Sequence, residues 1–331
     1  MVFRSKNILG PYERKVVLER GSTAINGPHQ GAWVETQTGE SWFFHFQDKD
    51  AYGRIMHLQP MHWVADFPMI GLDLDKNGIG EPVEGKQKKP NVGKTDAAIN
   101  PLPNGSDFTS STVSDEFSSA TLGLQWQWEA NPQPNWCFLS PAESVLKLYN
   151  QTVPHTAVNL WGVPNVLLQK FPAANFTATT KLTFYPKADD EETGLLVSGM
   201  DYSFISIRKT TAGLAISQVI CKDAVGGKPE KRSADSIVKS ETIYLKVQVQ
   251  NVENKSPLYA KIGRTDNESP QGNALCRFSY SLDGQTYMPM GEDFFARKGK
   301  WVGSKVGLFA IRKGKTYEYG YSDVDWFRVK R

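Results

Sequence analysis

A single histidine, His29, lies in the stretch INGPHQGAWVETQTGESWFFHFQ, between a Gly-Pro turn and a run of strand-forming residues. A neutral imidazole can bind a metal ion, act as a general base or simply hydrogen-bond within its own loop. Hard cations such as calcium require six to eight oxygen ligands, and one imidazole supplies none. His29 therefore needs carboxylates from elsewhere if it is to take part in chemistry.

A formal calcium-loop pattern occurs further along, in DLDKNGIGEPVE. Asp73, Asp75 and Asn77 occupy positions one, three and five of the EF-hand pattern, with Gly78 and Glu84 at positions six and twelve. The motif requires a helix on each side, but HWVADFPMIG precedes it, a proline lies within it and a lysine-rich segment follows. These neighbours favour a tight polar turn over a calcium loop.

The composition excludes several other kinds of chemistry. The 331 residues carry a formal charge of +3, which argues for neither nucleic acid nor an anionic membrane as partner. The three cysteines form no CxxC pair, and the chain has no GxSxG, Walker A or GxGxxG motif. No organic cofactor is expected. No apolar run is long enough to cross a membrane, and the first residues do not form a signal peptide.

The elements that would position candidate residues are β-strands. Short segments rich in Val, Ile, Phe, Trp and Tyr alternate with Gly, Pro and Asn turns, and helical periodicity is almost absent. GAWVETQTGESWFFHFQ is predicted to be a hairpin. We assign residues 1–84 to one β domain, 85–110 to a surface linker rich in Lys, Pro and Gly, and 111–331 to a two-sheet sandwich or jelly roll.

Several long motifs resemble glycoside hydrolase family 43. RSKNILGPYE, GPHQGAW, WFFHFQDKDAYGRIMHLQPM and GEPVEGKQKKPNVG are similar to the closing blades of the family's five-bladed β-propeller. VSDEFSSATLGLQWQWEANP, SLDGQTY, GKWVGSKVGLFA and DVDWFRV are similar to the concanavalin A-like β-sandwich that follows the propeller in xylosidases and arabinofuranosidases. The resemblance covers nearly the whole chain and predicts an all-β protein, a partial propeller followed by such a sandwich.

The resemblance implies inverting hydrolysis of xylosyl or arabinofuranosyl linkages. That reaction uses a carboxylate base and a carboxylic acid about 6.5–9.5 Å apart, with room for a water between them. In the family both residues, and the aspartate that tunes the acid, precede the segment similar to RSKNILGPYE. We therefore expect the catalytic acids to lie upstream of Met1 and the chain to be inactive alone.

Two residues match positions of the family's site. His29 matches the histidine on the propeller axis, which helps to hold a hydrated ion. Arg54 matches an arginine that reaches the sugar, and Gln30 is expected to line the same pocket. Without the resemblance, Arg54 is a surface arginine and His29 is a loop histidine.

A second ion is implied for the sandwich, where jelly rolls of this type bind structural calcium. Glu116 of SDEF and Asp325 of DVDWFRV fit such a pair by resemblance, and ordinary strand-end carboxylates are the alternative. Four tryptophans could form a sugar-stacking face: Trp126, Trp128, Trp136 and Trp161. The period-two spacing of Trp126 and Trp128 favours instead a place in the core or at a domain interface.

Two functions remain open at this point. The first is the catalytically incomplete family 43 glycosidase just described, whose partner would be a hemicellulose-derived oligosaccharide. The second is a non-catalytic carbohydrate-binding or accessory module in which the sandwich does the binding. Family members are often extracellular or periplasmic, but the sequence fixes neither the localisation nor the oligomeric state.

Overall fold

The computed structural model describes residues 1–25, 29–93, 113–252, 272–314 and 318–331, apart from the side chain of His29. The described residues form strands and three short 3-10 helices, η1 (Asp50–Tyr52), η3 (Leu160–Gly162) and η4 (Ala224–Gly226). None of their helices has the length and apolar character needed to span a membrane. The chain divides into two compact units, residues 1–49 with 54–107, and residues 50–53 with 108–331.

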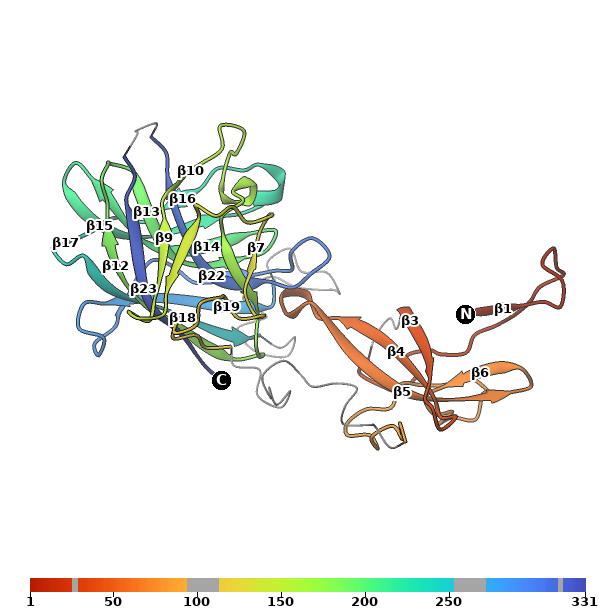
Figure 1. Ribbon diagram of the computed structural model, residues 1–331. Coiled ribbons are helices and arrows are strands. Elements are labelled where there is room, and N and C mark those ends of the chain that lie inside the picture. Colours follow the sequence, from red (N-terminus) through yellow and green to blue (C-terminus); the bar gives the residue numbers. More distant parts are fainter. Residues whose placement is uncertain (26–28, 94–112, 253–271, 315–317) are drawn as a thin grey trace. The chain divides into compact units, whose positions relative to one another are not determined.

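The first unit contains two open antiparallel sheets (Figure 1). β1 (Val2–Arg4) pairs with β2 (Glu13–Lys15). The larger sheet has the order β3-β4-β5-β6, which is the size of one propeller blade. Its strands are β3 (His29–Glu35), β4 (Ser41–Asp48), β5 (Arg54–Val64) and β6 (Phe67–Ile70).

The predicted hairpin is confirmed, because β3 and β4 pair across the turn that contains Gly39. A small core of Val17, Met61, Phe67 and Ile70 holds this unit together. Large apolar side chains nevertheless remain exposed on the sheet, including Trp33 and Trp63, each 50% exposed. Exposed apolar area of this kind and unpaired edge strands are typical of a surface that packs against further protein.

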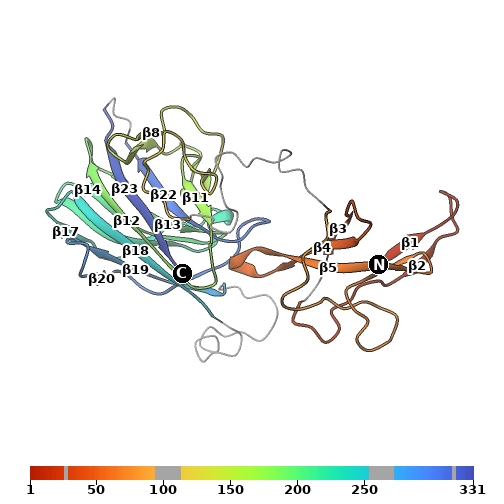
Figure 2. The same ribbon diagram turned by 60° about the horizontal axis from the view of Figure 1, so that its bottom comes forward.

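The second unit is a β-sandwich, seen from two sides in Figures 1 and 2. Its nine-stranded sheet has the order β16-β15-β14-β13-β22-β11-β7, with β10 beside β22 and β17 beside β15. The strands are β7 (Gln127–Trp128), β10 (Gln151–Thr152), β11 (Leu167–Lys170), β13 (Glu191–Ser198), β14 (Tyr202–Thr210), β15 (Gly213–Cys221), β16 (Lys231–Arg232), β17 (Ser236–Val238) and β22 (Lys305–Arg312).

The eight-stranded sheet has the order β20-β19-β18-β12-β23-β9-β8, with β21 beside β19. Its strands are β8 (Cys137–Ser140), β9 (Val145–Tyr149), β12 (Phe176–Tyr185), β18 (Thr242–Asn251), β19 (Ala274–Ser281), β20 (Met288–Pro289), β21 (Phe294–Ala296) and β23 (Tyr321–Lys330).

Period-two alternation determines which face of each strand is buried. In β12, Phe176, Ala178, Leu182 and Phe184 enter the core between the sheets, while the intervening side chains face outward. Strands β13, β14 and β15 are buried on both faces, because a second apolar cluster covers the outer face of the nine-stranded sheet. The eight-stranded sheet therefore presents the polar and aromatic outer face.

The tetrapeptide Asp50–Gly53 belongs to the sandwich unit. Ala51 is fully buried in the sandwich core, and its amide donates to Asn273 Oδ1 at 3.1 Å. The Tyr52 hydroxyl donates to the carbonyl of Ala174 at 2.9 Å, and the Ser304 amide donates to the carbonyl of Ala51 at 2.7 Å. These bonds join residues that are far apart in the chain.

Candidate functional site

The structure places two of the predicted site residues next to Phe46 of β4. The backbone of His29 is opposite Phe46 in the β3–β4 register. Arg54, the first residue of β5, holds its guanidinium carbon 4.4 Å from the centroid of the Phe46 ring. A cation over an aromatic face is held electrostatically and loses little freedom when it binds a ligand. The side chain of His29 lies outside the described residues, so its predicted ion contact stays a prediction.

Gln30 follows directly, at a break in the strand register. Its φ angle is +52°, and pairing resumes only at Ala32. A β-bulge of this kind redirects a side chain out of the regular alternation, and the Gln30 side chain is exposed. A predicted site role for Gln30 remains untested, but its backbone differs from that of an ordinary strand residue.

A cavity of about 490 Å³ lies in the same unit, and sequence reasoning had proposed no pocket there. The cavity is lined by Ala24, Ile25, Gln47, Lys49, Met56, His57, Leu58, Val83, Glu84, Gly85 and Gln87. Glu84 Oε1 accepts a hydrogen bond from the Ala24 amide at 2.6 Å, and Gln47 Nε2 donates to the Ala24 carbonyl at 2.9 Å. These two bonds fix the segment before β3 against β4, through Gln47, and against the chain after β6, through Glu84.

A pair of histidines supports one wall of this cavity. The rings of His45 on β4 and His57 on β5 stack with centroids 5.3 Å apart. Gln59 lies 3.2 Å from the Nε2 atom of His45, and its Oε1 accepts a bond from the Val83 amide at 2.7 Å. Both His45 and Gln59 are fully buried. Gln59 thus connects β4 to the chain at Val83 through hydrogen bonds.

The chemistry available in the cavity is hydrogen bonding. Among the lining residues that the structure describes, Glu84 is the single carboxylate. Burial, followed by the charge of Lys49, lowers the pKa of His57, so its imidazole is neutral at pH 7. Amides, a neutral imidazole and one carboxylate can bind hydroxyl groups. Inverting hydrolysis needs two carboxyl groups, and these lining residues do not provide them.

The lowered pKa of His57 predicts a pH-dependent stability. The unfolded chain takes up this proton at the ordinary histidine pKa of about 6.5, whereas the folded chain takes it up only at lower pH. The contribution of His57 to the free energy of unfolding should therefore be complete above pH 6.5, and it should decline as the pH falls from 6.5 through the lower pKa of the folded state. We expect His57→Gln to remove this part of the decline, measured as the unfolding midpoint against pH.

His62→Gln is the matched control for that experiment, because His62 is an exposed histidine of the same strand. If His62→Gln flattens the pH profile as much as His57→Gln does, the burial of His57 is not the cause.

The calcium-loop pattern is a polar turn, as its neighbours predicted. The Gly78 amide donates to Asp73 Oδ2 at 3.0 Å, and the Asn77 amide donates to Asp75 Oδ1 at 3.1 Å. Glu84, the twelfth position, instead holds the Ala24 amide. Strand β6 precedes the loop where an EF-hand has a helix. The loop closes through its own backbone amides.

The two carboxylates proposed for structural calcium each have a cationic partner. Arg328 donates to both oxygens of Glu116, at 2.7 and 2.8 Å, and this contact lowers the pKa of Glu116. Lys181 Nζ lies 2.8 Å from Asp325 Oδ1. Within the described ranges no three His, Cys, Asp or Glu side chains form a group that could hold a metal. Both carboxylates are thus engaged by cationic side chains, and calcium binding at Glu116 and Asp325 stays a prediction.

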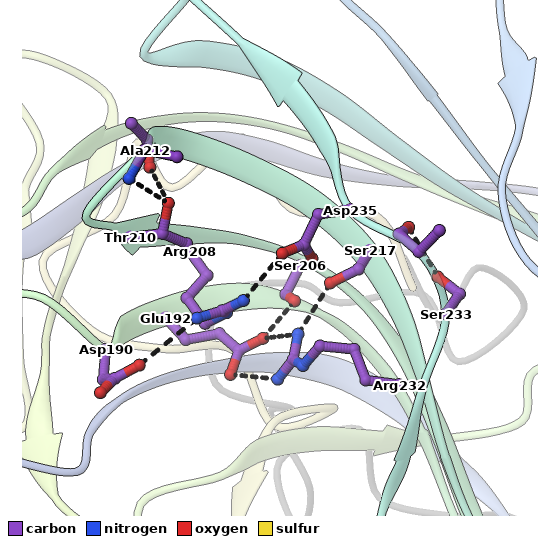
Figure 3. A network of polar contacts seen from close by, with 12 residues as sticks. Asp190, Glu192, Ser206, Arg208, Thr210, Ala212, Ser217, Arg232, Ser233 and Asp235 are labelled. Atoms are coloured by element: carbon purple, nitrogen blue, oxygen red, sulfur yellow. Dashed lines mark hydrogen bonds and ion pairs between the residues drawn. The ribbon is translucent and has the colours of Figure 1, made fainter.

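A network of buried charge, which sequence reasoning missed, lies on the nine-stranded sheet (Figure 3). Glu192 on β13 is 1% exposed and accepts bonds from both terminal nitrogens of Arg232, at 2.7 and 2.9 Å. Ser206 donates to the same carboxylate, and Arg232 also donates to Ser217 at 2.8 Å. Glu192 and Arg232 are far apart in sequence, so no local signal links them. The carboxylate, the guanidinium and the two serine hydroxyls hydrogen-bond one another, and we interpret this network as stabilising the fold.

Two of the four tryptophans are buried, and the other two are half-buried against apolar clusters. Trp126 and Trp136 are each 8% exposed, and Trp128 packs against Trp136 with ring centroids 5.3 Å apart. Trp161 packs against the second apolar cluster. These four side chains do not form an exposed stacking surface.

Comparison with known proteins identifies the relatives of this chain. A family model described as the beta-xylosidase C-terminal concanavalin A-like domain, of glycoside hydrolase family 43, matches residues 114–330. A protein of Xylanibacter ruminicola named "Putative beta-xylosidase" is 35% identical over 310 residues, which are 92% of this chain and 49% of that protein. A beta-xylosidase of Formosa agariphila is 31% identical over 99% of this chain and 52% of its own length.

The fold is also shared with a solved structure. The xylan beta-1,4-xylosidase from Bacillus halodurans C-125 aligns with a TM-score of 0.74 at 18% identity, over 99% of this chain and 59% of that chain. Such identity shows the fold alone, and it confirms the predicted fold class, a partial propeller followed by a concanavalin A-like sandwich. The chain spans about half the length of the curated relatives it matches. Since the family model covers most of it, the chain belongs to glycoside hydrolase family 43, through that family's β-xylosidase C-terminal concanavalin A-like domain.

Proposed function

We propose that this chain is the C-terminal part of a family 43 glycosidase that hydrolyses xylosyl or arabinofuranosyl linkages of hemicellulose. The observation that carries the proposal is the extent of the similarity. Relatives named as beta-xylosidases match 92% and 99% of this chain, while the chain spans only about half of each relative. A hemicellulose-derived oligosaccharide is the proposed ligand, and an extracellular or periplasmic location belongs to the same proposal.

In this proposal the four-stranded sheet is one blade of the propeller, and its Arg54 contacts the sugar. The guanidinium over Phe46 is held in place and has several N–H donors for sugar hydroxyls. His29, whose backbone is opposite the same phenylalanine, is proposed to hold an axial ion or its water. Gln30, exposed on the adjacent bulge, is proposed to border the same pocket.

We also propose that these 331 residues alone do not hydrolyse glycosides. General acid–base catalysis supplies about 10²–10⁴-fold in rate for each positioned group, and the described cavity is lined by one carboxylate, Glu84. We expect no turnover of aryl β-xylosides or aryl α-arabinofuranosides above the uncatalysed rate. The measurement is release of the aryl group by the purified chain, with a complete family 43 xylosidase as positive control.

Turnover by the chain would overturn the proposed inactivity. The variant Glu84→Gln then decides its source, because loss of that turnover would assign chemistry to the carboxylate in the cavity. Turnover that Glu84→Gln leaves unchanged would point to a contaminating enzyme, which repeated purification removes.

A further inference from the structure

Three tyrosines form one continuous rung across the outer face of the eight-stranded sheet. The rung crosses the neighbouring strands β9, β23 and β12 (Figure 1). Tyr321 on β23 is directly opposite Tyr149 on β9 and also directly opposite Tyr185 on β12. Side chains two residues apart share a face, and Leu148 and Phe184, the residues next to Tyr149 and Tyr185, lie in the core. The three rings therefore face away from the core.

The rings lie close together and remain accessible. The centroids of Tyr185 and Tyr321 are 4.9 Å apart, and those of Tyr149 and Tyr321 are 6.2 Å apart. Tyr185 is 36% exposed. Tyr149 and Tyr321 are half-buried, so part of each ring is accessible to solvent.

The adjacent rung is polar. Asp323 on β23 is opposite Lys147 on β9 and Thr183 on β12. Lys147 forms an ion pair with Asp323, and its ammonium lies 4.1 Å from the centroid of the Tyr321 ring. Beyond Lys147, the edge strand β8 adds Phe138, which is 56% exposed. An aromatic rung thus lies beside a row of hydrogen-bond donors and acceptors.

The pairing of these charges indicates what kind of ligand fits. The positive charge of Lys147 is already offset by Asp323, and the next lysine on this face, Lys181, is paired with Asp325. A polyanion would gain little at the rung itself, because the two lysines nearest to it are paired with carboxylates. A neutral polyhydroxyl chain matches it better, because sugar hydroxyls both donate and accept while the C–H faces of the rings pack on aromatic side chains.

We propose that the tyrosine rung, Tyr149, Tyr321 and Tyr185, is a binding surface for a neutral polysaccharide chain of the hemicellulose class. The three tyrosines belong to the sandwich unit, whereas Arg54 and the cavity belong to the first unit. The ligand class rests on the proposed function, whereas the location rests on the strand register and exposure alone. A second copy of this chain is the competing occupant, and the experiment separates the two.

The test measures binding of the full chain to soluble xylan, arabinoxylan and glucomannan by affinity gel electrophoresis, with calorimetry on a xylohexaose. We expect Tyr185→Ala to weaken binding about tenfold or more, as loss of an exposed aromatic anchor does. Tyr185→Phe keeps the ring and should retain most of the affinity. Tyr12→Ala is the matched control, because Tyr12 is an exposed tyrosine of the other unit, 54% exposed. Added salt should not weaken binding of a neutral ligand.

Each outcome bears on the proposal. If wild type and Tyr185→Ala bind equally and have the same unfolding midpoint, the ligand binds elsewhere and the tyrosine rung is not the binding surface. Binding to none of the three polysaccharides also overturns it, as does a dimer that Tyr185→Ala dissociates. Binding to glucomannan alone, lost in Tyr185→Ala, keeps the rung and rejects the xylan-type ligand of the proposed function. The aryl glycoside assay is independent of all four outcomes.

Discussion

Replacing Arg232 by leucine is expected to lower the free energy of unfolding of the sandwich by about 3–5 kcal/mol, the cost of leaving a buried charge without its partner. Glu192 is 1% exposed and accepts two bonds from the Arg232 guanidinium. In Arg232→Leu the bond from the Ser206 hydroxyl to the Glu192 carboxylate would remain, but no positive charge would offset that carboxylate (Figure 3). Urea-induced unfolding of the full chain, followed by intrinsic fluorescence, measures the loss.

Arg277→Leu is the matched control for this prediction. Arg277 also pairs with a carboxylate of the sandwich, Asp293, but the two side chains are 51% and 46% exposed. Exposed pairs contribute about 0–1 kcal/mol. The double variant Glu192→Leu with Arg232→Leu should recover much of the stability, since it removes the unpaired charge. Similar losses in Arg232→Leu and Arg277→Leu would show that burial does not determine the cost.

Replacing Gly303 by alanine is expected to destabilise the sandwich by about 3 kcal/mol, at the upper end of the usual cost of overpacking. A Cβ atom at position 303 would lie 2.6 Å from the amide nitrogen of Gly53 and 2.8 Å from the carbonyl oxygen of Ala51. Both are backbone atoms, so no side chain can move away to relieve the contact. The bond from the Ser304 amide to Ala51 would be lost as the tetrapeptide Asp50–Gly53 shifts.

Gly314→Ala is the control for Gly303→Ala, because a Cβ there meets no atom within 4 Å, and its effect should stay within about 0.5 kcal/mol. Limited proteolysis gives a second readout. Release of Asp50–Gly53 should make the chain near Tyr52 cleavable in Gly303→Ala at conditions in which wild type resists. Equal stability and equal resistance in both variants would show that the tetrapeptide is not essential to the core.

Strand positions could be predicted because they follow from local alternation. In FTATTKLTFY every second residue is apolar or small, and those residues are the ones that β12 buries. The hairpin of β3 and β4 was predicted for the same reason, together with its Thr-Gly turn. The preference for packed over sugar-facing tryptophans also agrees with the structure, in which Trp126 and Trp136 are buried. In each case the signal lies within about ten residues of chain, which is the range over which periodicity is informative.

The candidate sites could be predicted only in part. Arg54 was chosen by resemblance, but its contact with the Phe46 ring depends on the pairing of β4 with β5. The pairs Glu116–Arg328 and Asp325–Lys181 each join residues more than a hundred positions apart in the sandwich sequence. The sequence indicated the two carboxylates as candidates, but it did not show which cationic side chains pair with them. The cavity beside His57 likewise combines residues from four separate segments.

By itself the sequence determined the all-β class, many of the strand-forming segments and the family, because alternation, turn residues and long motifs are properties of contiguous chain. Only the tertiary structure decided that Asp50–Gly53 enters the sandwich core, that Arg232 neutralises Glu192, and that Tyr149, Tyr321 and Tyr185 share one rung. The physical reason is register. Which residues face each other across a sheet depends on the packing of strands distant in sequence, and a shift of one residue would turn each of these side chains to the opposite face.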